Sequence, residues 1–242
     1  MPWFDVPDIA QGQTYIMCAM PLPTSIPPFG SGRRLTPLDR IIAAADQATR
    51  TILAPSVANR PYPAEGLPET VRSEADRRHI AGLMRVNHAG EIAAQALYQG
   101  QALVASGDAT RESLLEAGRE ETDHLAWCER RARELGGRTS LLSPLWYGGS
   151  FAIGVLAGLS SDRTSLGFVA ETEQQVVDHL SSHLAQLPAD DERTRAIIQK
   201  MSDDEARHGH DAIRAGGVAL PTITRALMKL TAKVMTRTAY WI

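Results

Sequence analysis

Residues 121–124 read Glu-Thr-Asp-His, and residues 205–208 read Glu-Ala-Arg-His, so both stretches place a glutamate three positions before a histidine. Positions three apart on an α-helix share one face, and both side chains can reach the same bound ion. One such pair is weak support in a chain with 7 histidines, whereas two pairs are much stronger. The two stretches therefore predict two helices that turn a metal-binding face toward a common interior.

A lone glutamate precedes each pair at a similar distance. Glu91 lies 30 residues before Glu121, and Glu173 lies 32 residues before Glu205. Helical bundles that hold two metal ions take one glutamate from each of two helices and a Glu-x-x-His pair from each of the other two. The repeated spacing therefore predicts a metal site built from six residues: Glu91, Glu121, His124, Glu173, Glu205 and His208.

The chemistry of this set favours a pair of iron or manganese ions. Four buried carboxylates without partners would be very costly, and two divalent ions supply four positive charges against their four negative ones. Imidazole and carboxylate ligands together suit iron or manganese. Zinc fits less well, because the set has no cysteine and its six ligands exceed one tetrahedral site.

Several acids and histidines lie close to the predicted ligands. Glu171 competes with Glu173 for the ligand position, and the spacing leaves both open. His88 lies one turn before the first lone glutamate, where a hydrogen bond to a ligand and simple packing are both reasonable roles. Asp123 and Asp204 adjoin the ligands, so we expect them either to orient the opposite histidines or to be solvated acids.

The apolar pattern places these residues on four long helices. Apolar residues recur at helical spacing over four segments, at about 74–105, 109–135, 163–187 and 190–215. The joints at Gly107 and Pro188 are short and predict antiparallel neighbours, whereas the connection between the two pairs is long. Two helical hairpins joined by one crossover are the ferritin-like arrangement. We therefore predict an all-α fold, a ferritin-like four-helix bundle.

The chain is expected to begin with a segment of different character. The N-terminal stretch is rich in proline and carries Asp5 and Asp8 but no Lys or Arg, so it fits neither a signal peptide nor a transit peptide. Thr36 followed by Pro37 is typical of a helix start. We expect a disordered leader over residues 1–32 and an amphipathic helix with a proline-rich linker over residues 33–70. The bundle is expected over residues 71–242, with a crossover helix at about 141–160 and a basic C-terminal helix at about 221–242.

Composition excludes several classes of protein. The chain has 242 residues, of which 43% are apolar and 22% charged, so it can bury a core and global disorder is not expected. The formal net charge of −3 argues against a nucleic-acid partner. Two cysteines are too few for a disulfide framework or a zinc ribbon, and we expect a reducing compartment.

One segment resembles a known family. Residues 83–91, Leu-Met-Arg-Val-Asn-His-Ala-Gly-Glu, resemble the signature of the 3-demethoxyubiquinol 3-hydroxylases, the di-iron enzymes of ubiquinone biosynthesis. The resemblance runs from about Leu35 to the C-terminus and includes residues 121–124, 169–173 and 204–208. In that family, the metal-binding glutamate of the third helix lies six residues before a histidine.

The resemblance decides between two glutamates. Glu173 lies six residues before His179, as the family pattern requires, so the resemblance favours Glu173 over Glu171. It also makes His179 a candidate for a place beside the ligands.

The implied activity is ring hydroxylation of a polyprenyl-methoxy-methyl-benzoquinol with O2 and two electrons. The sequence has no nicotinamide or flavin fingerprint, so we expect the electrons from the quinol itself or from a partner, such as another protein of ubiquinone biosynthesis. Two iron ions per chain are implied, and some glutamates must bridge them. By the resemblance, the first three residues of the set hold one iron and the other three complete the set: Glu91, Glu121 and His124, then Glu173, Glu205 and His208.

Because the polyprenyl tail of the implied substrate is very apolar, we expect the protein to meet that substrate at a bilayer. The uncharged stretch 139–161 is long enough to span a membrane, but spanning would separate the two hairpins, so an interfacial or buried helix is favoured. Arg225, Lys229, Lys233 and Arg237 are four apart and suit an anionic lipid surface. A soluble amphipathic helix that covers the bundle is the alternative. We expect additional membrane-interface helices and a peripheral protein on the cytoplasmic face of a bacterial cell membrane.

Three other functions compete. An iron-storage or ferroxidase bundle of the ferritin type would explain the ligands but not the apolar crossover or the basic tail. Another ferritin-like di-iron oxygenase would act on tRNA or a fatty-acyl chain, and the net negative charge argues against tRNA. A metal-free helical protein that organises lipid or quinone partners would keep its activity if Glu121 were replaced. The family signature favours the hydroxylase.

Overall fold

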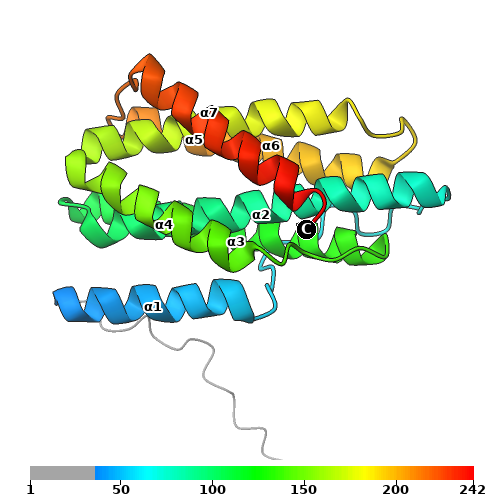
Figure 1. Cartoon of the computed structure of the whole chain (residues 1–242), viewed down its shortest axis with the longest axis horizontal. Helices are drawn as coiled ribbons and strands as arrows, with labels where there is room; N and C mark the ends of the chain where they lie inside the picture. The colour runs from blue at the N-terminus through cyan, green and yellow to red at the C-terminus, as the bar shows by residue number, and fades with distance from the viewer. Residues whose placement is uncertain (1–35) are drawn as a thin grey trace, which may run out of the picture. The chain divides into compact units, whose positions relative to one another are not determined.

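Seven helices and no strand occur in residues 36–242, the part of the chain that this computed structural model describes (Figure 1). The predicted all-α fold is therefore confirmed. The predicted leader, residues 1–32, lies outside the described residues. The helices are α1 Pro37–Leu53, α2 Glu74–Val104, α3 Asp108–Glu134, α4 Ser143–Ser160, α5 Asp162–Leu184, α6 Glu192–Arg214 and α7 Thr222–Ala239.

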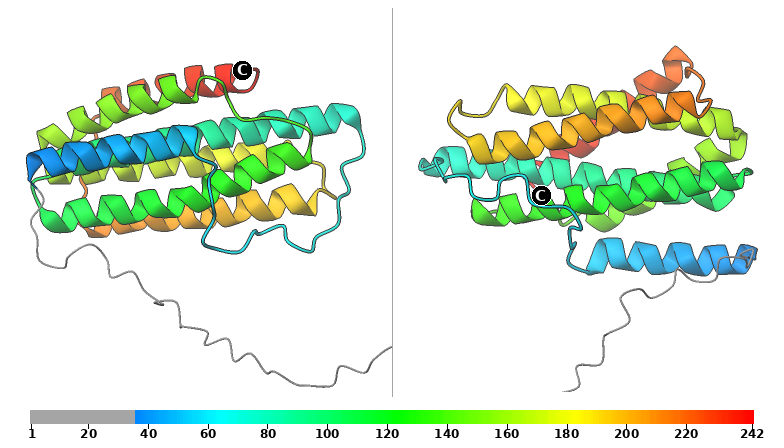
Figure 2. Two further views of the ribbon diagram at one scale, coloured as in Figure 1. Left: turned by 90° about the horizontal axis from the view of Figure 1, so that it is seen from below. Right: turned by 180° about the vertical axis from the view of Figure 1, so that it is seen from behind.

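Four of these helices form the bundle as two antiparallel hairpins. Residues 105–107 join α2 to α3, residues 185–191 join α5 to α6, and the two helices of each hairpin pack along their length. The crossover is α4, which connects the hairpins and packs mainly on α2. Figure 2 shows α3 and α6 on one side of the bundle and α4 and α7 on the opposite side. The predicted ferritin-like arrangement is confirmed.

Local hydrogen bonds set the helix ends. The side chain of Thr36 accepts from the backbone N–H of Asp39, whose carboxylate accepts from the N–H of Thr36, so the predicted start of the first helix is confirmed. The third bundle helix, α5, ends at Leu184, three residues before the predicted end. The chain already turns there, because the N–H of Gln186 donates to the carbonyl of His183 in a tighter turn.

Two apolar clusters lie at different levels of the bundle. The first cluster includes one or more residues from each bundle helix: Met84, Trp127, Leu180 and Met201. The second cluster also draws on all four helices: Tyr98, Leu114, Val169 and Ala212. The stretch of each helix between these positions is therefore enclosed by apolar side chains on both sides along the bundle.

Ion pairs and hydrogen bonds fix the linker between α1 and α2 to the bundle. The fully buried Arg131 of α3 binds Glu69 of the linker at 2.5 Å and Asp191 at 3.2 Å. Arg193 of α6 donates to the carbonyl oxygen of Leu67 at 2.6 Å. These contacts hold the linker against α3 and α6.

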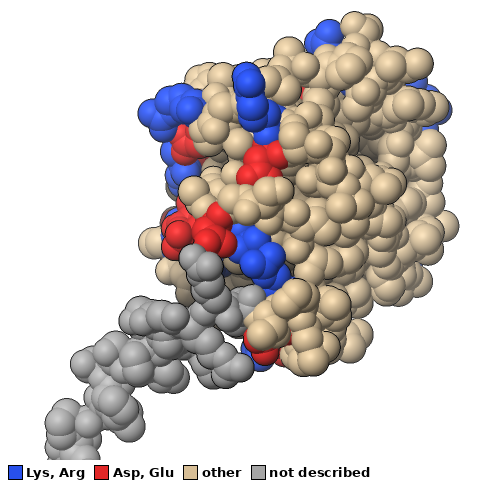
Figure 3. All heavy atoms as spheres, turned by 90° about the vertical axis from the view of Figure 1, so that its left-hand side faces the viewer, with Lys and Arg blue, Asp and Glu red and all other residues tan. Residues whose placement is uncertain are grey.

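The helices α1, α4 and α7 leave apolar side chains exposed. These are Leu38, Ile41, Ile42 and Leu53 on α1, Leu145, Leu156 and Leu159 on α4, and Ile223, Leu227, Leu230 and Val234 on α7. Figure 3 shows one end of the molecule, where a broad area carries no charged side chain. The four basic residues predicted to form a stripe are exposed on α7. None of the described helices combines the length and the apolarity needed to cross a membrane.

Glycines let α4 approach α2 backbone to backbone. A Cβ atom on Gly154 would overlap the carbonyl oxygen of Leu97, and a Cβ atom on Gly100 would overlap the carbonyl oxygen of Phe151. By contrast, a Cβ atom on Gly148, also in α4, would meet open space. The position of the crossover on α2 therefore depends on the absence of side chains at particular points of contact.

We expect Gly154→Ala to lower the free energy of unfolding by about 3 kcal/mol, because the added methyl group must push α4 away from α2. Gly148→Ala is the matched control, since it adds the same group to the same helix where there is room. It should raise the free energy of unfolding by up to about 1 kcal/mol. Urea denaturation of the metal-free protein, followed by circular dichroism, measures both. Equal effects would contradict the close contact.

Candidate metal centre

All six residues predicted as ligands lie together in the interior of the bundle, between the two apolar clusters. They form two groups, and within each group one potential ligand atom per residue lies within 4.8 Å of all the others. The groups are Glu91, Glu121, His124 and Glu205, and Glu121, Glu173, Glu205 and His208. Every member is buried. The set predicted from sequence thus coincides with two adjoining groups that can each hold a metal ion.

The two histidines turn the same ring nitrogen toward the carboxylates. Nδ1 of His124 lies 2.8 Å from Oε2 of Glu121 and 3.0 Å from Oε1 of Glu205. Nδ1 of His208 lies 3.3 Å from an oxygen of each of these glutamates. Glu121 and Glu205 therefore lie between the two imidazoles and belong to both groups.

Burial and charge crowding shift the protonation of the site. Burial and neighbouring carboxylates raise the pKa of Glu91 and Glu173 well above the usual range. Burial acts to raise the pKa of Glu121 as well, but the two neighbouring imidazoles outweigh it and lower that pKa. Burial would lower the pKa of His208, but its hydrogen bonds to Glu121 and Glu205 raise it to about 11. Without a metal, the site therefore keeps protons that offset its negative charge.

Among the described residues of the site, three buried carboxylate oxygens lack a hydrogen bond of good geometry. They are Oε1 of Glu173, and Oε1 of Glu121 and of Glu205, which meet only a histidine Nδ1, at 3.3 Å and 3.0 Å. Buried acceptors without a partner are costly, so native structures nearly always provide one. Divalent metal ions would satisfy these oxygens, and a set of carboxylates and imidazoles suits iron or manganese. The orphaned oxygens and the chemistry of the donor set both fit a metal-bound state.

Each histidine meets a further carboxylate through its other ring nitrogen. Nε2 of His124 lies 3.2 Å from Oδ2 of Asp204, and Nε2 of His208 lies 3.2 Å from Oε2 of Glu120. In both cases the carboxylate comes from the opposite hairpin and directly precedes a glutamate of the site. Such contacts fix the orientation and the tautomer of a ligand imidazole. Of the two roles that the sequence leaves open for Asp204, the contact with His124 fits the orientation of a histidine.

Asp123 is placed differently from the expectation. Its carboxylate accepts from the backbone N–H of Asn59 at 2.6 Å and from Nε of Arg60 at 2.5 Å, and it is buried. Asp123 follows Glu121 by two residues, about 200° around the helix, so it faces the linker. The expectation that it orients a histidine or is solvated is wrong, and Glu120 orients the opposite histidine instead. The signal for Glu120 is that an acid directly precedes the ligand glutamate in both repeats.

The remaining candidates are less closely tied to the site. Glu173 is buried within the second group, whereas Glu171 is partly exposed and hydrogen-bonds within its own helix. Burial lowers the pKa of His88 to about 4, and the ring of His179 packs on that of His183 at 4.0 Å. Among the described residues, neither His88 nor His179 has a hydrogen bond or ion pair with the six site residues.

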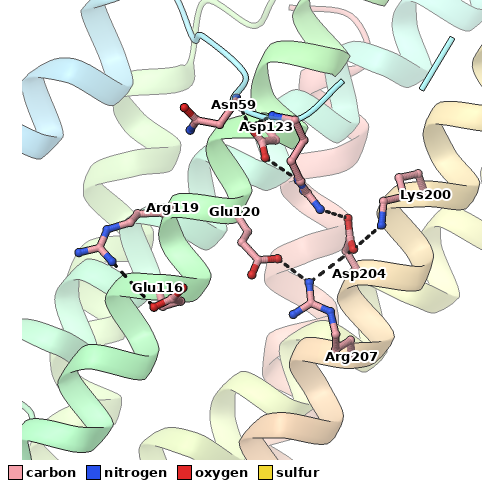
Figure 4. A pocket seen from close by; sticks show the side chains of 9 residues that line it. Asn59, Glu116, Arg119, Glu120, Asp123, Lys200, Asp204 and Arg207 are labelled. Carbon is pink, nitrogen blue, oxygen red and sulfur yellow. Dashed lines mark hydrogen bonds and ion pairs between the residues drawn. The ribbon is translucent and has the colours of Figure 1, made fainter. Parts of the chain in front are cut away.

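A cavity of about 470 Å³ opens beside the site, between α3 and α6 (Figure 4). Charged residues of both signs line it, and Arg207 of α6 reaches across to Glu120 of α3. Asp204 lies on the same wall, where its Oδ1 is 3.4 Å from Arg207. The two carboxylates that meet the histidines therefore separate those histidines from this hollow.

Comparison with known proteins agrees with this geometry. Residues 78–239 match the sequence model of the family described as "Ubiquinone biosynthesis protein COQ7". A 3-demethoxyubiquinol 3-hydroxylase of Nitrosococcus oceani is 56% identical over 212 residues, which cover 87% of this chain and 99% of that protein. Proteins of the same name from Nitrosomonas europaea and Bordetella parapertussis are 54% and 55% identical, over 85% and 87% of this chain and 99% and 96% of theirs. The family resemblance found in the sequence is confirmed, and the chain belongs to the COQ7 family of ubiquinone biosynthesis proteins.

Proposed function

We propose that the six clustered residues hold two iron ions and that this centre serves the ring hydroxylation of a demethoxyubiquinol. As a member of its family, the chain is a hydroxylase of ubiquinone biosynthesis. The observation that carries the iron site is the pair of adjoining groups, each with three carboxylates and one imidazole, inside a bundle of the di-iron type. Two ferrous ions would match the four carboxylates in charge.

In this proposal Glu121 and Glu205 would contribute to both metal positions. These two residues are shared by both groups, and each has an oxygen near Nδ1 of both histidines. The remaining residues then complete one ion each: Glu91 with His124, and Glu173 with His208.

The protein's own contribution is to orient the ligands and exclude water. Bound iron supplies the activation of O2 that ring hydroxylation requires. Asp204 and Glu120 hold the outer nitrogen of the two imidazoles, which leaves Nδ1 of each ring free for a metal. The apolar clusters on either side keep the carboxylates in a medium of low polarity, which strengthens their attraction for cations.

The exposed apolar residues of α1, α4 and α7 seat the protein on the cytoplasmic face of the cell membrane in this proposal. A polyprenyl tail dissolves in a bilayer, so the quinol ring must be taken from one. Leu227 and Leu230 are more than half exposed, which supports contact with lipid over a helix that buries its apolar face on the bundle. Exposed basic residues beside them suit anionic headgroups.

Anaerobic reconstitution with Fe(II) should give about two iron ions per chain. Addition of demethoxyubiquinol and O2 should then give a product heavier by one oxygen atom, measured by mass spectrometry. Glu173→Ala should lower the affinity for iron at one of the two positions, and the turnover, by more than the roughly 10- to 100-fold typical of outer-sphere changes. Glu171→Ala is the matched control, two residues away on the same helix, and should leave both unchanged.

Other outcomes of this experiment separate the alternatives. Iron bound without any hydroxylated product would favour iron storage or another ferritin-like oxygenase. A well-folded protein that binds no metal would contradict the iron site itself.

Loading of the metal-free protein should release protons, and the affinity for Fe(II) should rise with pH. Burial and nearby carboxylates keep Glu91 and Glu173 protonated, and nearby carboxylates raise the pKa of His124 and His208 despite their burial. Metal binding requires the deprotonated ligands, so protons compete with the metal below the raised pKa values, and for His208 this competition extends to about pH 11. Anaerobic titration in weak buffer with a pH indicator measures the release. An affinity that does not change with pH would contradict the assigned ligands.

Binding to vesicles tests the membrane surface. The Lys229→Gln/Lys233→Gln variant should bind vesicles containing phosphatidylglycerol roughly 30-fold more weakly at low salt, because two charges near an anionic surface are lost. Arg119→Gln/Arg130→Gln is the matched control on α3, on the opposite side of the bundle, and should bind as the wild type does. Sedimentation of the vesicles measures both. Equal losses, or self-association instead of vesicle binding, would contradict this surface.

A further inference from the structure

Arg60 belongs to the linker, outside the four bundle helices, yet its side chain reaches the edge of the proposed metal centre. Its Nε donates to Oδ2 of Asp123 at 2.5 Å, and its Nη1 donates to Oδ2 of Asp204 at 2.8 Å. These two carboxylates come from α3 and α6, on opposite walls of the charged cavity (Figure 4). Arg60 therefore joins the two hairpins at the level of the site.

The atom that Arg60 holds is the atom that meets the histidine. Oδ2 of Asp204 accepts from Arg60 and lies 3.2 Å from Nε2 of His124. The other oxygen of this carboxylate, Oδ1, pairs with Lys200 at 2.8 Å and with Arg207 at 3.4 Å. Three cations of the described part of the chain thus fix the carboxylate, and among them only Arg60 binds the oxygen that faces the imidazole.

Arg60 also contacts Trp127, the aromatic ring that packs beside the imidazole of His124. The guanidinium carbon of Arg60 lies 4.8 Å from the ring centre of Trp127, and that ring lies 5.4 Å from the ring of His124. The backbone N–H of Asn59 binds Asp123 at 2.6 Å and fixes the start of the Arg60 side chain. Arg60 therefore touches both side chains that flank His124, and its own backbone is held in place.

We propose that Arg60 is a positioning residue for His124: it holds Asp204 on Nε2 so that Nδ1 is presented to a metal ion. This inference rests on the proposed metal site. An imidazole held through its outer nitrogen keeps one tautomer and one orientation, and loss of such a hold typically weakens metal binding. A residue outside the bundle thereby sets the affinity of one of the two metal positions.

The second histidine depends on a different arginine. Nε2 of His208 meets Glu120, and Glu120 is held by Arg207, which lies on α6 and has a side chain that is 45% exposed. Arg60 is less exposed, at 29%. Loss of Arg60 should therefore weaken the metal position served by His124 and leave the position served by His208 unchanged.

The test is anaerobic titration of the full chain with Co(II), followed by visible absorption, and repeated with Fe(II). Wild-type protein should take up two ions. Arg60→Gln should weaken one of them about 10-fold or more and leave the other unchanged. Arg193→Gln is the matched control, because it removes another arginine contact to the linker, at Leu67, far from His124. It should leave both affinities at their wild-type values.

A double variant keeps the test independent of any general loss of stability. If Arg60 acts through Asp204, Arg60→Gln should add no further loss of Co(II) affinity to an Asp204→Asn variant. Additive losses would overturn the inference, as would equal weakening of both metal positions or equal effects of Arg60→Gln and Arg193→Gln. A wild-type protein that binds neither Co(II) nor Fe(II) would instead overturn the proposed metal site.

Discussion

The whole structure depends on placing four carboxylates and two imidazoles in the middle of a helical core. Such groups are strongly disfavoured in apolar surroundings unless opposite charges or protons accompany them. The pKa directions at the site agree with this, because burial and crowding favour the neutral form of Glu91 and Glu173 and the charged form of His208. The centre of the bundle therefore needs bound protons or cations to balance its carboxylates, and the apolar clusters on either side exclude the water that could otherwise solvate them.

Charges alternate in sign from this centre to the surface on the α3–α6 side. Carboxylates face Nδ1 of the histidines, further carboxylates face Nε2, and arginines hold those outer carboxylates in turn. The opposite side, formed by α4 and α7, exposes leucines and a row of bases instead (Figure 2). The two sides of the bundle thus differ in chemistry: one carries paired charges of both signs, and the other, within the described residues, carries exposed leucines and unopposed bases.

The fold and five of the six central residues could be predicted because their signals are local and repeated, whereas the choice of Glu173 over Glu171 needed the family resemblance. The spacing of Glu-x-x-His depends only on helix geometry, and Thr36 marks a helix start by a bond to a residue three positions away. Arg60 gave no such signal, because its partner Asp204 is 144 residues distant and an irregular linker brings the two together. The role of Asp123 was predicted wrongly for a related reason. Its neighbours in sequence are candidate ligands, but the helix points its side chain toward the linker, where it binds Asn59 and Arg60.

Both metal-binding groups take residues from both hairpins, so neither hairpin contains a complete site. Each hairpin carries the same ligand pattern and supplies half of the six residues, as each subunit of a homodimer would. The crossover makes their meeting intramolecular, so it occurs at an effective concentration that does not depend on how dilute the protein is. Fusion has a second consequence. The halves of a homodimer must be identical. Here the carboxylate beside His124 is bound by Arg60 of the linker, whereas the carboxylate beside His208 is bound by Arg207 of α6. A single chain can therefore give the two proposed metal positions different properties, which a symmetric dimer cannot do.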